Sequence, residues 1–199
     1  MNKQTIIFVG RSGAGKGVQS KLLQEFFQKE MPQTKLLYIE TGQYFRKYVQ
    51  GAGYTWDRAR VTNNRGGRQP DFLAAWIWST LFVETLQGDE SIIFDGTPRS
   101  LGEAHMLHTA LSFYEYEKPI VVFLDVSRDE AEKRLIGRGR TDDLNPEAIA
   151  RRFAWYDNDV VPAIDFYRTD PTYHFLSTNG EQAPEKIHAD IVAYLKANN

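Results

Sequence analysis

The stretch Gly10-Arg11-Ser12-Gly13-Ala14-Gly15-Lys16-Gly17 decides how the rest of this sequence is interpreted. It follows an apolar run at residues 5–9, typical of a buried strand, and it opens a helical pattern that begins at Lys16. Glycines at this spacing let the backbone fold around phosphate oxygens with successive N–H groups pointing inward, and the helix N-terminus adds a favourable dipole. A lysine at this place reaches the β- and γ-phosphates of a nucleotide. The sequence therefore predicts a phosphate-binding loop between a strand and a helix.

The loop departs from its usual form at one position. A serine or threonine normally follows the lysine and holds magnesium through its hydroxyl, but Gly17 stands there. Either this is a glycine-rich turn without a ligand, or it belongs to kinases that hold magnesium mostly through water. The complete order of strand, loop, lysine and helix favours ATP binding. The residues expected to bind it are Gly10, Gly13, Ala14, Gly15, Lys16, Gly17 and Val18.

Beyond the loop, short β-type runs alternate with helical patterns, which indicates a parallel sheet covered by helices. Strands are expected at residues 5–9, 36–39, 92–94, 120–124 and 173–175. Helices are expected at residues 16–29, 41–49, 71–86, 101–114, 128–136, 146–167 and 184–197. Residues 51–69, rich in glycine and arginine, are interpreted as a mobile segment that contributes little to the core. The expected fold class is α/β, a doubly wound P-loop fold with five parallel strands.

Composition limits the function classes. The 199 residues suit one domain, and 24 Lys and Arg against 26 Asp and Glu give a net charge of −2. Such a chain has no bulk electrostatic reason to bind nucleic acid or an anionic membrane. With no cysteine, it has neither disulfides nor thiolate catalysis. We expect no secretory signal, because the first strand begins within a few residues of Met1, and the apolar runs fall short of the roughly 20 residues that span a bilayer. We expect a cytoplasmic protein.

Several segments, in order, resemble the adenylate kinases and related nucleoside monophosphate kinases. Residues 10–19 resemble the family's phosphate loop, although Ser12 and Val18 replace a usual proline and threonine. Four further segments follow in the family's order, at residues 41–46, 66–71, 95–99 and 134–143. The resemblance implies reversible, Mg²⁺-dependent transfer of the ATP γ-phosphoryl group to a nucleoside monophosphate, with AMP as the first candidate. It also implies a monomer, which is the family's default.

The resemblance assigns the acceptor side to three of these segments and to single residues beyond them. Asp95 would hold magnesium through water, and Thr97, where the family has phenylalanine, removes apolar packing without an obvious change in chemistry. The residues expected to bind the acceptor are Thr41, Gly42, Arg46, Gly96, Arg99, Glu103, Arg140 and Arg152.

Glu103 stands where adenylate kinases usually place a glutamine that reads adenine as both donor and acceptor. An ionised carboxylate only accepts hydrogen bonds, so it suits the two adjacent donors of guanine better than the unprotonated N1 of adenine. The alternative is that Glu103 points to solvent and another group reads the base. Both interpretations stay open at this stage.

The last matching segment implies a lid and the groups that surround the transferred phosphate. Arg134 would lie against the donor adenine with Gly180, while Asp142 and Asp143 would order the closed lid. The expected layout is one domain, residues 1–199, with its core at 1–40, 70–137 and 144–199, a helical acceptor flap at about 41–69 and a minimal lid at about 138–143. The residues expected to be catalytic are Lys16, Arg99, Arg138, Arg140 and Arg152.

Two other interpretations compete with a nucleoside monophosphate kinase. One is a nucleotide-binding regulator without turnover, suggested by Gly17, Val18 and Glu103; the other is a P-loop kinase of another small acceptor. Outside the motifs, His105 and His108 are interpreted as ordinary helix residues rather than metal ligands, and Trp76 and Trp78 as core residues.

Overall fold

A parallel five-stranded sheet forms the centre of the molecule. The computed structural model describes residues 3–139 and 145–198, and within them the strand order is β2-β3-β1-β4-β5. Ile7 of β1 pairs with Phe94 of β3 on one side and with Val121 of β4 on the other, so β1 is the central strand. The predicted α/β fold is confirmed. The strands are β1 (Thr5–Val9), β2 (Leu36–Glu40), β3 (Ser91–Asp95), β4 (Ile120–Asp125) and β5 (His174–Asn179).

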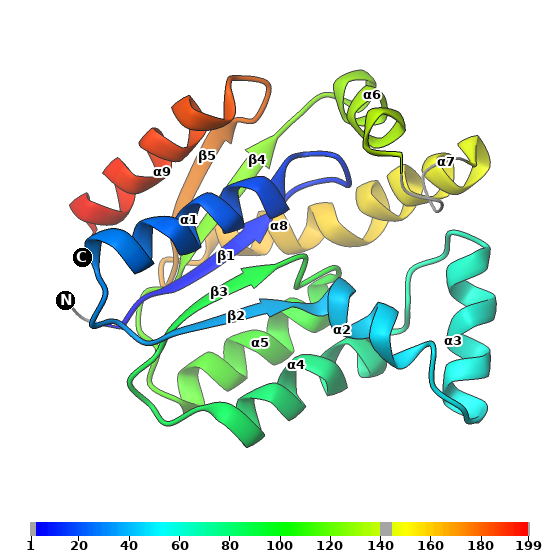
Figure 1. The fold of residues 1–199 in the computed structure, drawn as a ribbon, viewed down its shortest axis with the longest axis horizontal. Coiled ribbons are helices and arrows are strands. Elements are labelled where there is room, and N and C mark those ends of the chain that lie inside the picture. The colour runs from blue at the N-terminus through cyan, green and yellow to red at the C-terminus, as the bar shows by residue number, and fades with distance from the viewer. Residues whose placement is uncertain (1–2, 140–144, 199) are drawn as a thin grey trace.

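Helices cover both faces of the sheet (Figure 1). Ile6 and Phe8 point into one core with α1 (Lys16–Glu30), α6 (Arg128–Arg138), α7 (Pro146–Trp155) and α9 (Pro184–Ala197). Ile7 and Val9 point into the other core with α4 (Asp71–Thr85), α5 (Leu101–Phe113) and α8 (Val161–Thr169). Because both faces are covered, β1 is apolar along almost its whole length rather than alternating. None of the helices in the described part of the chain is both long and apolar enough to cross a membrane.

The parallel strands bring the polar segments together at one edge of the sheet. All five strands end at the same edge, toward which the arrows in Figure 1 run. Since Phe8 pairs with Asp95, the phosphate loop after β1 and residues 95–99 after β3 leave the sheet side by side. Ligands of open parallel sheets bind beyond the carboxyl ends of the strands. The fold therefore places two predicted site segments next to each other.

Few of residues 51–69 are buried, as the sequence predicts, but they contain a helix that the sequence analysis does not predict. After α2 (Thr41–Tyr48), the chain forms a further helix, α3 (Tyr54–Asn64), beyond the carboxyl edge of the sheet (Figure 1). Trp56 of α3 stacks on Tyr48 with ring centroids 5.2 Å apart, and Ala59 is buried in a small cluster with Phe45. Only two apolar residues of α3 face its neighbours, so the periodicity is too weak to reveal the helix from sequence. Residues 41–69 are called the flap below.

Trp76 is not a core residue, although Trp78 is. Positions two residues apart on a helix point about 200° apart, so the two side chains lie on opposite faces of α4. Trp78 is buried, whereas Trp76 is 43% exposed and its ring lies 5.3 Å from Tyr48 and 5.9 Å from Trp56. Trp76 therefore supports the flap.

The single helix predicted at residues 146–167 is interrupted. Between α7 and α8 lies a π-helical turn, η2 (Tyr156–Val160), in which the Val161 N–H donates to the carbonyl of Tyr156, five residues earlier. Pro162 has no N–H to continue the regular ladder, and such turns are frequent at functional sites. β5 also runs four residues beyond its predicted end, because polar Ser177 and Thr178 pair with β4.

The packing of α5 on the sheet gives a stability prediction. Leu107 is fully buried in the core that α4, α5 and α8 share, so Leu107→Ala removes apolar contacts and leaves a cavity. We expect a loss of about 2–5 kcal/mol in the free energy of unfolding, measured by urea denaturation. Val83, 77% exposed on α4, is the control, and Val83→Ala should change stability by less than about 1 kcal/mol. Equal losses in the two variants would contradict the assigned core.

Candidate active site

The phosphate loop has the tight backbone that its glycines predict. Gly13 has a φ of +88°, and a Cβ there would lie 2.4 Å from the carbonyl oxygen of Ala131, so only glycine fits this approach to α6. The Ala14 N–H donates to the Arg11 carbonyl at 3.1 Å and closes the turn. The following helix starts at Lys16, so its N-terminal N–H groups and its dipole lie at the loop, as anion binding requires.

Lys16 lies inside the loop it belongs to. Its Nζ donates to the carbonyl oxygens of Gly10 at 2.7 Å and Arg11 at 2.9 Å. Burial, helped by the charges of Arg99 and Arg138 and opposed by Asp95, lowers the pKa of Lys16 to about 8. The ammonium is therefore held among backbone acceptors close to other positive charges.

Asp95 lies across from the start of α1. Its Oδ2 would be 3.4 Å from a Cβ on Gly17, so the missing side chain at position 17 leaves space between the loop and this carboxylate. Burial raises the pKa of Asp95, which Lys16 and a 3.1 Å hydrogen bond from the Tyr38 hydroxyl oppose. The same hydroxyl lies 3.4 Å from Glu40 Oε2. Sequence analysis missed Tyr38 and Glu40, although both lie at the end of a strand that reaches the site edge.

This arrangement fits a magnesium ion that keeps most of its water. Mg²⁺ is usually held by one or two carboxylates together with substrate phosphates. Within residues 3–139 and 145–198, no group of three His, Cys, Asp or Glu side chains is placed to form a full protein cage. A single carboxylate beside the side-chain-free Gly17 suits a hydrated ion instead.

Three of the predicted acceptor arginines lie close together. The Nε of Arg99 donates to the Gly96 carbonyl at 2.7 Å, and Arg46 forms a 2.8 Å ion pair with Glu40. A Cβ on Gly42 would lie 3.2 Å from Arg46 Nη1 and 3.4 Å from Arg99 Nη2, so both guanidinium groups border that glycine. Burial lowers the pKa of Arg99, and the charges of Arg46 and Arg152 add to this effect. Such a group of guanidinium forks suits the oxygens of a phosphate.

Thr41 and Thr97 are joined through their hydroxyl groups, and both residues are buried. The sequence analysis gives the Thr97 hydroxyl no role, but the structure gives it a structural one. Its hydroxyl ties the start of the flap to the segment that carries Arg99. A phenylalanine could not make this bond.

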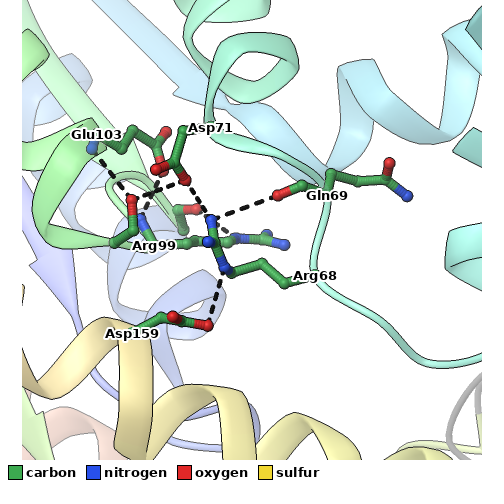
Figure 2. Close-up of polar contacts among 8 residues, drawn as sticks. Arg68, Gln69, Asp71, Arg99, Glu103 and Asp159 are labelled. Atoms are coloured by element: carbon green, nitrogen blue, oxygen red, sulfur yellow. Dashed lines mark hydrogen bonds and ion pairs between the residues drawn. The ribbon is translucent and has the colours of Figure 1, made fainter.

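Glu103 does not point to solvent, because its side chain is fully buried. Its Oε2 accepts a 2.6 Å hydrogen bond from the Arg99 N–H (Figure 2), whereas its Oε1 has no hydrogen-bond partner among the described residues. Burial, opposed by the hydrogen bond and the charge of Arg99 and helped by the nearby Asp71, raises the pKa of Glu103 to about 7. A carboxyl group in this place changes its protonation near neutral pH, which sequence reasoning could not anticipate.

The donor side is assembled around Arg134. Its Nη1 donates to the Gly180 carbonyl at 2.9 Å, and the same Nη1 would be 3.9 Å from a Cβ on Gly15 of the phosphate loop. Arg138 ends α6 near enough for its charge to affect Lys16. The predicted site residue Arg140 lies outside the described residues, as do Asp142, Asp143 and most of the lid at 138–143.

The two histidines of α5 contribute to packing. The Nδ1 of His108 lies 2.9 Å from the Tyr173 hydroxyl oxygen, and the ring of His105 packs edge-on against Phe166.

Comparisons with known proteins agree with this geometry. The family model described as adenylate kinase matches residues 8–172. The chain is 35% identical to an adenylate kinase of Leptospira biflexa over 186 residues, which cover 92% of this chain and 94% of that protein. It is 31% identical to an adenylate kinase of Phocaeicola vulgatus over 192 residues, 94% of this chain and 96% of that protein. It is also 29% identical to an adenylate kinase of Oenococcus oeni over 179 residues, 89% and 91% of the two chains.

The raised pKa of Glu103 gives a pH-dependent prediction. Between pH 4.5 and about 7 the unfolded chain releases this proton while the folded protein keeps it, so the wild type loses stability as pH rises through this window. Glu103→Gln keeps an acceptor for the Arg99 N–H and has no such proton. We expect urea unfolding from pH 4 to pH 8 to show the variant gaining on the wild type by up to about 3 kcal/mol.

The control for this titration is Glu185→Gln, which changes an exposed carboxylate on α9. Parallel stability profiles of wild type and Glu103→Gln across the whole pH range would contradict the buried, shifted carboxyl group.

Proposed function

Because the chain belongs to the adenylate kinase family, it is a phosphotransferase that acts on a phosphate group, and we propose that it phosphorylates AMP with ATP in a reversible, Mg²⁺-dependent reaction. One observation supports the proposal most directly. The acceptor arginines Arg46 and Arg99 border Gly42, and Arg99 lies near enough to Lys16 of the phosphate loop to lower its pKa. One anion-binding group therefore faces another at the carboxyl edge of the sheet.

The chemistry needs alignment more than proton transfer. An acceptor phosphate is already an anionic nucleophile, so its oxygen attacks the γ-phosphorus directly while the bond to the β–γ bridging oxygen breaks, leaving two nucleoside diphosphates. The protein must hold the two anions in line and neutralise the charge of the transferred group. Lys16, Arg99, Arg138, Arg140 and Arg152 are the residues proposed for this role.

The donor nucleotide occupies the phosphate loop and the adjoining turn. The backbone of Gly10, Gly13, Ala14, Gly15, Gly17 and Val18 binds its phosphates, and Arg134 with Gly180 borders its base. Asp95 holds magnesium through water, and the ion supplies positive charge to the phosphates when it is bound.

The acceptor nucleotide lies between the flap and residues 95–103. Arg46, Arg99 and Arg152 bind its phosphate, together with Thr41 and the glycines Gly42 and Gly96. Glu103 contributes to base selection. In its neutral form Oε1 can donate a hydrogen bond to adenine N1, whereas the ionised form would favour the N–H donors of guanine. Burial raises the pKa of Glu103 and so favours the neutral form that suits AMP.

Closure completes the proposed site. The flap at 41–69 and the lid at 138–143 exclude water that would otherwise hydrolyse ATP. We place the protein in the cytoplasm as a monomer, without nucleic-acid or membrane partners, in keeping with its lack of cysteine and its small net charge.

The proposal is tested by diphosphate formation from Mg-ATP with AMP, GMP, CMP or UMP. We expect turnover with AMP, and we expect Lys16→Ala to reduce kcat at least 100-fold because it removes a charged donor from the transferred phosphate. Lys21→Ala, an exposed lysine on the same helix, is the control and should match the wild type.

Two outcomes would contradict parts of the proposal. Near-normal turnover in Lys16→Ala would remove the role of the phosphate loop. ATP binding without turnover of any monophosphate would favour a nucleotide-binding regulator or a kinase of another small acceptor.

A further inference from the structure

The end of the flap contacts α7, the helix that carries Arg152, and also the π-helical turn η2 that follows it. Gly66 has a φ of +67°, and a Cβ there would lie 2.8 Å from both Cα and Cβ of Ala148 on α7, so the two backbones are in close contact. Two residues later, Arg68 Nε donates to Asp159 Oδ2 on η2 at 3.1 Å. The returning segment of the flap is thus held against α7 and η2.

Arg68 uses the rest of its guanidinium group on the other side. Its Nη1 pairs with Asp71 at the start of α4 and lies 3.3 Å from the Gln69 carbonyl oxygen. Figure 2 shows Arg68 between Asp71 and Asp159, which come from different elements. The Arg68 side chain is only 20% exposed, so these charges are less screened by water than an ordinary surface pair.

A chain of hydrogen bonds continues from Asp71 to the acceptor clamp. Asp71 Oδ1 accepts from the Ser100 hydroxyl at 2.8 Å, and Ser100 Oγ accepts from the Glu103 N–H at 3.1 Å. Glu103 Oε2 in turn accepts from the Arg99 N–H at 2.6 Å. Every link between Arg68 and the backbone of Arg99 is therefore a direct contact.

The π-helical turn also reaches the donor side. Tyr156 lies on η2, as Asp159 does, and its ring centroid is 4.7 Å from the guanidinium carbon of Arg11 in the phosphate loop. The same short turn thus contacts the donor loop through one residue and the flap through another.

We propose that Arg68 is a positioning residue of the acceptor site. Through Asp159 it holds the flap against α7 and η2, and through Asp71 it holds the segment that carries Arg99 in place. Arg68 acts through these neighbours. The inference rests on the proposed function for the identity of the acceptor, but its geometric part concerns only this chain. A planar guanidinium can meet two carboxylates on opposite sides, whereas a lysine ammonium is a single point charge.

The experiment compares Arg68→Gln, Arg68→Lys, Asp159→Asn and the double variant Arg68→Gln/Asp159→Asn with the wild type. Initial rates give KM for AMP, KM for ATP and kcat, and calorimetry gives the Kd of AMP without ATP. Lys186→Gln, which breaks an exposed pair with Asp190 on α9, is the control.

We expect Arg68→Gln to weaken AMP binding about tenfold while KM for ATP stays within twofold. Asp159→Asn should weaken AMP binding about threefold, and it should add nothing once Arg68 is Gln, because the contact is already lost. Arg68→Lys should recover only part of the loss. Unchanged AMP binding in Arg68→Gln, equal losses for ATP and AMP, or multiplying effects in the double variant would overturn the inference.

Hydrogen exchange tests the geometric part without turnover. The N–H groups of Arg99 and Glu103 donate to side chains within the network, so Arg68→Gln should speed exchange in peptides covering residues 66–71 and 97–104 and leave α9 unchanged. If the wild type does not bind AMP, the proposed function is contradicted. The hydrogen-exchange result then decides by itself whether Arg68 holds these segments in place. Unchanged exchange in both segments would overturn it whatever the substrate is.

Discussion

Positive charge is concentrated at the carboxyl end of the sheet, and the fold must hold it there against its own repulsion. Burial lowers the pKa of both Arg99 and Lys16, and neighbouring positive charges add to the shift, those of Arg46 and Arg152 at Arg99 and that of Arg99 at Lys16. Positive charges that are buried close to one another are tolerated only when negative groups lie among them. Asp95 and Glu40 supply part of that compensation, and the phosphates of two nucleotides supply much more. The sheet core, buried on both faces, is the rigid support that keeps these side chains together.

The helix after the lid ties the parts of this site to one another. Its first portion carries Arg152, its π-helical turn contacts both Arg11 and Arg68, and its last portion packs into the core of the sheet. A regular α-helix repeats every 3.6 residues, and the wider turn changes the direction of the side chains that follow it. Pro162 marks the place where the regular ladder of hydrogen bonds cannot continue. One π-helical turn thus contacts both the phosphate loop, through Tyr156, and the flap, through Asp159.

Much of this architecture could be predicted from sequence because its signals are local. The loop at Gly10 to Gly17, the apolar strands and the strong helical patterns each reveal themselves within a few residues. What escaped prediction depends on partners far along the chain. Helix α3 is held by Tyr48 and Trp76 rather than by its own periodicity, and the partner of Arg68 lies 91 residues away. Glu103 was ambiguous for the same reason, since its burial and its bond to Arg99 follow from packing.

The position of Lys16 has a consequence for how quickly ligands leave. An ammonium group has three N–H donors, and Lys16 directs two hydrogen bonds to the carbonyls of Gly10 and Arg11. A phosphate that binds here replaces these carbonyls as the acceptor of hydrogen bonds that the Lys16 ammonium already makes. The net gain in binding free energy is therefore smaller than the contact suggests. The same carbonyls receive the ammonium again as a product departs. We therefore expect a product phosphate to be held less tightly than by a lysine without other hydrogen-bond partners, and each catalytic cycle must release two nucleoside diphosphates.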